Sequence, residues 1–156
     1  MRDEDQQIIQ FEHEKNFEND DFFISKANEH IINFLYKWPK WEKNFLNING
    51  EKFSGKSHLI DIFLKKFKGI KFDAKLFNEN TLRQIKIYQN IVIENLNNDI
   101  DEKLFYTLIN NIDQDNKFLI VTSLVSIVDI NFKLLDLKSR TKNFLLQKIE
   151  KPDDEL

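Results

Sequence analysis

The chain has 156 residues, of which 41% are hydrophobic and 31% are charged, a composition typical of one compact globular domain and not of a disordered segment. Its formal net charge of −3 argues against a general nucleic-acid-binding surface, and the absence of cysteine excludes disulfides and cysteine-based catalysis or metal sites. The histidines His13, His30 and His58 lie too far apart in the sequence for zinc-ligand spacing, and the polar N-terminus with only short apolar runs predicts a cytoplasmic protein.

The first third of the chain predicts an arm, a helix and a strand. Residues 1–20 have little hydrophobic periodicity and are expected to form an extended arm. Apolar side chains at helical spacing predict a helix over 25–38, which Pro39 ends. A strand is predicted over 44–49. A glycine-containing loop follows it and leads into a second amphipathic helix that ends at Gly69.

The remainder alternates apolar strands with helices. Strands are predicted over 70–74, 90–95, 117–123 and 144–150, a helix over 101–114, and partly helical structure over 75–88. Strands that are apolar on both faces and alternate with amphipathic helices indicate an α/β fold with a five-stranded parallel sheet covered by helices on both faces. Ligands on such sheets bind at the carboxyl ends of the strands, and the polar clusters of this chain fall at those ends.

The loop after the first predicted strand has the full spacing of a phosphate-binding loop, G-x-x-x-x-G-K-S. In such a loop, backbone N–H groups point at the phosphates, the lysine reaches the β- and γ-phosphates, and the serine hydroxyl binds Mg²⁺. A chance match is the alternative, but two of the chain's three glycines stand at the required positions. The sequence therefore predicts a nucleotide site with Mg²⁺, made by Gly50, Glu51, Lys52, Phe53, Ser54, Gly55, Lys56, Ser57 and His58; the family resemblance described below implies that the nucleotide is ADP or ATP.

Phe53 departs from the usual loop, where a small residue is common at this position. A bulky ring there has to point away from the phosphates, toward the base or a partner. We expect binding to tolerate it.

Polar residues end the two central predicted strands. Glu94 can serve the metal, but the following Asn95 cannot accept a proton and fails as a general base, so strong intrinsic hydrolysis is not expected. A hydroxyl of Thr122 or Ser123 can sense the γ-phosphate or the attacking water. An ordinary strand end turning into a polar loop is the alternative at both places.

The order of several short motifs resembles the DnaA/Hda family of AAA+ proteins. The motifs are "DDFFISKANEHIINFLYKWPKW", "NGEKFSGKSHL", "IVIENL", "FLIVTS" and "DLKSR", and the resemblance runs from about residue 6 to residue 156. It implies a P-loop AAA+ core over 21–156, preceded by the arm. DnaA's C-terminal helix-turn-helix is missing, so sequence-specific DNA binding is not expected. The chain stops at "KPDDEL", where the family continues into a helical lid, and whether the lid is naturally absent stays open.

The resemblance also implies roles for individual residues. Phe23 and Asn28 match the segment that borders the adenine, and Ser57 and Glu94 match the magnesium ligands. Thr122 and Ser123 match the first sensor region. Arg140, in "DLKSR", matches the arginine finger that acts on a neighbour's nucleotide, and a planar guanidinium suits a γ-phosphate better than lysine does.

The start of the arm, "QQIIQF", resembles the family's peptide that binds the sliding clamp of DNA polymerase III. In that reading Gln6 donates hydrogen bonds, and Ile9 and Phe11 fill an apolar groove. Packing of the arm on its own domain is the alternative.

Three functions follow as hypotheses. The first is a regulator that binds a nucleotide, docks on the clamp and presents Arg140 to ATP held by DnaA. The second is a self-contained AAA+ ATPase of the helicase-loader or initiator type. The third, a small-molecule P-loop kinase, needs a substrate-binding lid that the sequence does not display.

Overall fold

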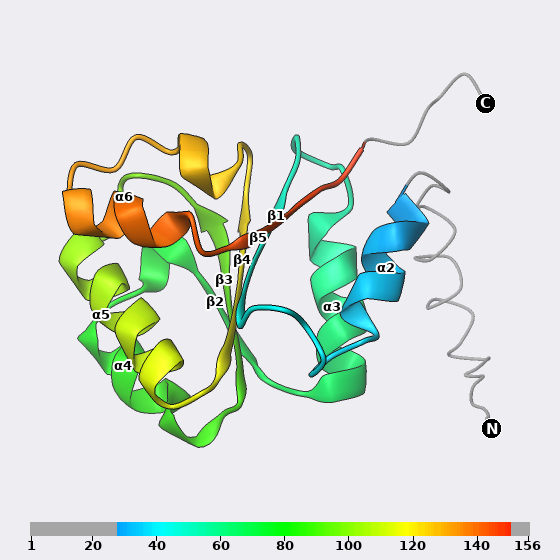
Figure 1. The fold of residues 1–156 in the computed structure, drawn as a ribbon, viewed down its shortest axis with the longest axis horizontal. Helices are drawn as coiled ribbons and strands as arrows, with labels where there is room; N and C mark the ends of the chain where they lie inside the picture. The colour runs from blue at the N-terminus through cyan, green and yellow to red at the C-terminus, as the bar shows by residue number, and fades with distance from the viewer. Residues whose placement is uncertain (1–27, 151–156) are drawn as a thin grey trace.

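The computed structural model describes residues 28–150, which form a five-stranded sheet with helices on both faces (Figure 1). The sheet order is β2-β3-β4-β1-β5, and every neighbouring pair is parallel. The strands are β1 (Phe45–Asn49), β2 (Ile70–Asp73), β3 (Asn90–Leu96), β4 (Phe118–Ser123) and β5 (Leu145–Lys148). The parallel α/β fold predicted from the sequence is confirmed.

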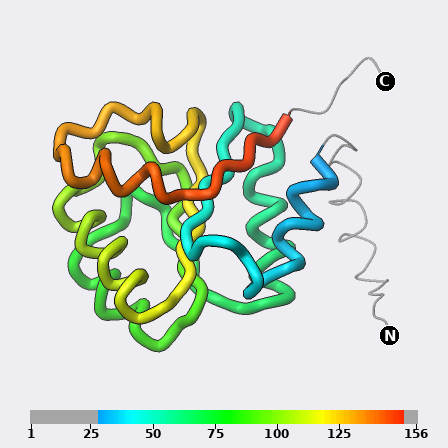
Figure 2. The backbone as a smooth tube through the Cα atoms, viewed as in Figure 1, coloured from blue at the N-terminus to red at the C-terminus, as the bar shows by residue number. Residues whose placement is uncertain are grey.

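The helices divide between the two faces of the sheet. On one face lie α2 (Glu29–Leu35) and α3 (Lys56–Phe67), and on the other lie α4 (Glu79–Gln84), α5 (Glu102–Gln114) and α6 (Leu135–Thr141) (Figures 1 and 2). Three 3₁₀ turns, η2 (Ala74–Leu76), η3 (Ile85–Ile87) and η4 (Ile127–Asp129), complete the described elements. Central strands β1 and β4 are buried at every residue, as a sheet covered on both faces requires.

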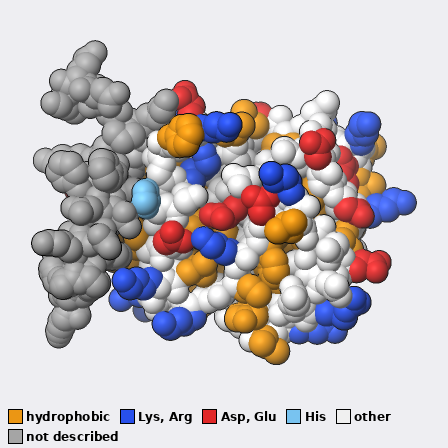
Figure 3. Space-filling model, turned by 180° about the vertical axis from the view of Figure 1, so that it is seen from behind, with side chains coloured by type: hydrophobic (Ala, Val, Ile, Leu, Met, Phe, Trp, Pro, Cys, Tyr) orange, Lys and Arg blue, Asp and Glu red, His pale blue; other side chains and the backbone are white. Residues whose placement is uncertain are grey.

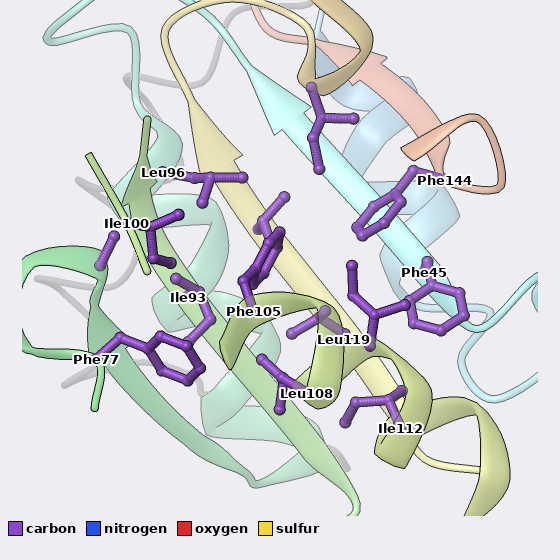
Figure 4. Packing of buried hydrophobic residues seen from close by; sticks show 14 of the residues in the cluster. Phe45, Phe77, Ile93, Leu96, Ile100, Phe105, Leu108, Ile112, Leu119 and Phe144 are labelled. Atoms are coloured by element: carbon purple, nitrogen blue, oxygen red, sulfur yellow. The ribbon is translucent and has the colours of Figure 1, made fainter. Parts of the chain in front are cut away.

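The core under α5 is mainly aliphatic with a few phenylalanines. Phe105 and Leu108 project from α5 onto the sheet, where Ile93 and Leu119 meet them (Figure 4). The apolar positions of α5 recur at helical spacing, and the Asp101 side chain caps the helix by accepting a hydrogen bond from the Leu104 N–H at 3.1 Å. Helix 101–114 was predicted, and its bounds agree within one residue.

The core under α2 and α3 is largely aromatic. Trp41 stacks on Phe34 with ring centroids 5.1 Å apart, and it also meets Phe63 and Phe118 at 5.7 Å each. Offset and edge-to-face contacts of this kind stabilise a core beyond the area they bury. This cluster fixes α3, and with it the loop that precedes α3, against the sheet.

One predicted helix is shorter in the structure, and one helix was not predicted. Among the described residues before Pro39, regular helix covers Glu29–Leu35 and turns occupy 36–39, so the predicted helix ends three residues early; 25–27 lie outside the described residues. The seven-residue helix α6 was not predicted, because only Leu137 and Thr141 of it are buried and it has no side-chain N-cap. Its stability comes from packing on α5, which local sequence does not reveal.

Within the described residues, no helix combines the length and apolarity needed to cross a bilayer.

Candidate nucleotide-binding site

The carboxyl ends of the strands surround a cavity of about 970 Å³. Strand register brings these ends together, with Asn49 of β1 opposite Ser123 of β4 and Asp73 of β2 opposite Glu94 of β3. One side of the cavity is formed by the loop between β1 and α3 and by the first turn of α3. The other side is formed by the end of β3 and by the segments that come after β2, β3 and β4. The lining residues include Lys52, Phe53, Ser54, Gly55, Lys56, Ser57 and His58, with Lys75, Asn95 and Leu124 opposite them.

The backbone of the loop depends on its two glycines. A Cβ on Gly50 would lie 2.4 Å from the Ile149 side chain and 2.8 Å from the Ile149 carbonyl oxygen, because β5 passes directly beside the loop (Figure 2). Gly55 begins α3 with φ 107°, in the left-handed region that glycine adopts without strain. The two glycines of the loop thus meet different requirements: Gly50 leaves room for Ile149, and Gly55 adopts a left-handed backbone conformation.

Lys56 is folded into the loop. Its ammonium donates hydrogen bonds to the carbonyl oxygens of Gly50 and Glu51, the second at 2.8 Å, and the residue is only 9% exposed. Burial lowers the pKa of the Lys56 ammonium below its ordinary value, and the Glu51 carboxylate acts in the opposite direction. The cation is therefore held at the loop by backbone oxygens that an anionic ligand could replace.

Ser54 offers a second polar group in the same loop. The residue is 2% exposed, and its Oγ has no hydrogen-bond partner among the residues that the structure describes. A buried hydroxyl without a partner is unfavourable, so the site gains if a ligand oxygen accepts from it. Ser57, one residue after Lys56, is exposed and also lines the cavity. This donor set, together with the N-terminus of α3, fits a polyphosphate.

Phe53 does not fill the loop. Its side chain is 92% exposed at the rim of the cavity, and its φ of 61° is unusual for a residue with a Cβ. The expectation that the ring points away from the phosphate position agrees with this geometry.

Glu94 is turned toward α3 and β2. Its carboxylate lies 4.0 Å from the Lys71 ammonium, which also bonds Asp61 of α3 at 3.0 Å. Burial raises the pKa of Glu94, the Lys71 cation opposes that shift, and the Asp61 and Asp73 carboxylates reinforce it. The described cavity lining includes Asn95 but not Glu94. Glu94 as a magnesium ligand therefore stays a prediction, and its present partner is a lysine.

The hydroxyls at the end of β4 are engaged within the fold. Thr122 Oγ1 accepts a hydrogen bond from the Asn95 N–H at 3.0 Å, where Asn95 has φ 64° beside an irregularity in the β3–β4 pairing. Ser123 Oγ accepts from the Asn47 side chain at 2.9 Å and donates to the Val125 carbonyl oxygen. Both residues are at most 2% exposed, so their sensing role also stays a prediction.

Comparison with solved structures identifies the architecture. DnaA from Aquifex aeolicus bound to AMPPCP superposes with a TM-score of 0.66 at 18% identity, over 86% of this chain and 49% of that chain. DnaI superposes with a TM-score of 0.64 at 14% identity, over 82% of this chain and 84% of that chain. The chain has the AAA+ fold. It spans about half the length of the DnaA chain. No protein-family model matches the sequence, and no curated protein matches it either.

In this AAA+ fold, Arg140 lies on α6, outside the described lining of the cavity. Its guanidinium donates to the Asn110 side chain of α5, lies 3.6 Å from the Asp113 carboxylate and sits 6.0 Å from the Tyr106 ring centroid. The structure therefore places Arg140 outside the lining of the cavity beside the loop between β1 and α3, and its role as an arginine finger stays a prediction.

Asn28 occupies a structural position. Its side-chain amide donates to the Glu150 carbonyl oxygen at 2.7 Å and accepts from the Glu150 N–H at 2.9 Å, across 122 residues of sequence. The residue is fully buried, and its two hydrogen bonds tie the start of α2 to the segment that follows β5. The other predicted contacts before it, Phe23 at the adenine and Gln6, Ile9 and Phe11 on the clamp, lie outside the described residues.

Sequence reasoning missed the asparagines inside β1. Asn47 is fully buried and accepts a hydrogen bond from the Ile127 N–H at 2.9 Å, while its amide donates to the Val121 carbonyl oxygen at 3.2 Å. It thereby fixes the turn after β4, which carries part of the cavity wall. An amide between Leu46 and Ile48, inside the predicted strand 44–49, was the available signal.

Proposed function

We propose that this chain is a nucleotide-binding regulator of chromosomal replication initiation. It holds ADP or ATP at the loop between β1 and α3, docks on the sliding clamp through its arm, and supplies Arg140 to ATP bound by DnaA. The observation that carries the proposal is the loop itself, where a buried lysine and a buried serine hydroxyl lie beside a cavity of about 970 Å³.

The chemistry of binding follows from the loop. Phosphate oxygens would accept from the Ser54 hydroxyl and from the backbone N–H groups that begin α3, and would replace the carbonyl oxygens now bonded to Lys56. The exposed hydroxyl of Ser57 would hold Mg²⁺, which neutralises phosphate charge. The likeness in fold to AMPPCP-bound DnaA supports an adenine nucleotide as the ligand.

Weak intrinsic hydrolysis is part of the proposal. A self-contained ATPase needs a carboxylate that orients or deprotonates water, and Asn95 has none. The Asn95 amide donates instead to the Asp73 carboxylate at 2.8 Å, and the nearby Glu94 carboxylate faces Lys71. These contacts support a chain that donates a group to a partner's site and turns over little nucleotide itself.

The face shown in Figure 3 is compatible with a protein partner and gives no support to a general nucleic-acid partner. On the face in Figure 3, Lys/Arg and Asp/Glu side chains are interspersed and no broad basic area stands out. The formal net charge of −3 agrees with that pattern.

The test has two stages. Calorimetry with ADP and with ATP plus Mg²⁺ should register binding, and the purified chain alone should release almost no phosphate from ATP. Adding the chain to ATP-loaded DnaA on clamp-loaded DNA should then accelerate hydrolysis, and Arg140→Ala should remove the acceleration. Arg83→Ala, which changes another arginine on the short helix α4, is the matched control. Acceleration that survives Arg140→Ala would show that the finger assignment is wrong.

The arm is tested separately. Gln6→Ala combined with Phe11→Ala should lose retention on clamp-coated beads, because the hydrogen-bonding and anchoring side chains are both removed. The control, Gln10→Ala with Glu12→Ala, changes neighbouring side chains of the same arm. Equal retention of both double variants would leave packing on its own domain as the arm's role.

One observation favours a second candidate, a self-contained ATPase of the helicase-loader type. The likeness in fold to DnaI, with a TM-score of 0.64 over 82% of this chain, is nearly as good as the likeness to DnaA, with a TM-score of 0.66 over 86%. In that case the chain alone should hydrolyse ATP, and Glu94→Gln should abolish the turnover. Near-zero turnover by the unmodified chain would exclude this candidate.

A further inference from the structure

Three polar side chains form a line along one flank of α5. Tyr106, Asn110 and Asp113 are spaced four and three residues apart, so they lie on one side of the helix. They border the buried stripe of α5, which packs on the sheet, and none of the three is itself buried. The chain thus presents an aromatic face, an amide oxygen and a carboxylate in sequence along a single helix.

The guanidinium of Arg140 lies along this line. One terminal nitrogen donates to Asn110 Oδ1, the other lies 3.6 Å from Asp113 Oδ2, and the guanidinium carbon is 6.0 Å from the Tyr106 ring centroid. The Arg140 side chain remains 24% exposed. These three contacts to a single helix fix the orientation of the guanidinium. They therefore also fix the direction of its N–H groups that have no contact with α5.

We infer that Asn110 and Asp113 are positioning residues for Arg140, with different tasks. Asn110 orients the guanidinium by a hydrogen bond that persists when a phosphate arrives. Asp113 is a counter-ion that the phosphate displaces. The inference deepens the proposed function and rests on it, since it describes how the finger is held before it meets a partner's nucleotide.

The difference between the two tasks follows from exposure and charge. Asp113 is 67% exposed, and an exposed ion pair is weak enough for a multiply charged phosphate to replace it. Asn110 is neutral, so its bond to the guanidinium does not compete with an incoming anion. A guanidinium carries five N–H donors, and the two polar contacts to α5 leave several of them for a bidentate phosphate contact. Orienting the long side chain in advance also lowers the entropy lost on docking.

The experiment uses the full chain and the nitrogen resonances of its arginine side chains. Only Arg2, Arg83 and Arg140 contribute, so single substitutions assign them. With ADP saturating the phosphate loop, the Arg140 terminal nitrogens should give separate resonances because their exchange by rotation is slowed. Tripolyphosphate, the probe anion, is then titrated while the Arg140 signal is followed.

Two variants separate the two tasks. Asn110→Ala should merge the Arg140 terminal-nitrogen resonances and weaken tripolyphosphate binding at Arg140 about three- to tenfold, the range expected for one lost hydrogen bond. Asp113→Asn should leave the resonances separate and tighten the same binding about two- to fivefold, as expected when an exposed competing charge is removed. Asp115→Asn, at the C-terminal end of α5, is the matched control and should do neither.

Opposite results overturn the inference. Resonances that stay separate in Asn110→Ala show that the amide does not orient Arg140, and unchanged or weaker binding in Asp113→Asn shows that the carboxylate is not a displaceable counter-ion. Failure of the proposed function gives a different pattern, in which both variants behave as expected with tripolyphosphate while Arg140→Ala leaves hydrolysis by DnaA unchanged.

Discussion

Two cations of this chain, Lys56 and Arg140, are held in contrasting ways. Lys56 is 9% exposed and bonds to backbone carbonyl oxygens of its own loop, which other parts of the fold hold in place. Arg140 is attached to the side chains of a neighbouring helix, and one of these, Asp113, is largely exposed. A cation enclosed by backbone suits a ligand that enters the molecule, whereas one carried on surface side chains suits a ligand brought by another molecule.

The segments that carry the two cations also differ in how firmly the rest of the fold holds them. The loop of Lys56 is fixed by close contact between Gly50 and Ile149 and by the aromatic core behind α3. The helix of Arg140 is seven residues long and depends on α5 for its position. Changes near Lys56 should therefore affect both binding and folding, while changes near Arg140 should affect function with little loss of stability.

The largest effect is expected from Lys56→Ala. Removing the cation should weaken nucleotide binding by about 10- to 100-fold, the range for hydrogen bonds to a charged group, as measured by calorimetry. Lys66→Ala, on the last turn of the same helix, should leave the affinity unchanged. If both variants bind equally well, the loop is not the phosphate site.

Gly50→Ala should destabilise the fold by about 1–3 kcal/mol, because a Cβ would lie 2.4 Å from the Ile149 side chain and the β5 backbone cannot retreat freely. Urea unfolding measures the change. Lys52→Ala in the same loop is exposed and should stay within about 0.5 kcal/mol of the unmodified chain. A stable Gly50→Ala chain would show that β5 is held loosely beside the loop.

Arg140→Ala is expected to change the free energy of unfolding by about 1 kcal/mol or less, since its ion pair with Asp113 is exposed. The same urea titration measures it. If the free energy of unfolding fell by several kcal/mol, Arg140 would be a structural link between α5 and α6, and it would not differ from Lys56 in its effect on stability.

The smallest effect concerns pH. The pKa of Glu94 is raised in the folded chain, so the folded state binds this proton more tightly than the unfolded state does. The stability that Glu94 contributes is present below its ordinary pKa of 4.5 and is lost as pH rises through the raised value. Glu94→Gln removes that loss, so its stability relative to the unmodified chain should improve between pH 4 and pH 8, as paired urea titrations would show. Glu79→Gln on α4 makes the same chemical change away from Lys71 and is the matched control.

Much of the fold could be predicted because its signals are local. The continuous apolar runs of β3 and β4, the helical stripe of α5 and the glycines of the loop each carry their own pattern. The parallel direction of the strands, though not their order in the sheet, also followed from the alternation of strands and helices. Helix α6 was not predicted, because a seven-residue segment with only two buried side chains has almost no hydrophobic periodicity.

The sequence by itself determined that a loop with the glycine, lysine and serine spacing of a phosphate-binding loop stands between a buried strand and a helix, because that spacing is local. Only the tertiary structure decided the partners of the other polar groups, since those contacts join distant segments: Asn28 with Glu150 across 122 residues, and Arg140 with Asn110 across 30. Glu94 likewise meets Lys71 only because β2 and β3 pair in a particular register. A carboxylate, an amide and a guanidinium bind whatever the fold brings within reach, and a residue type alone does not specify that neighbour.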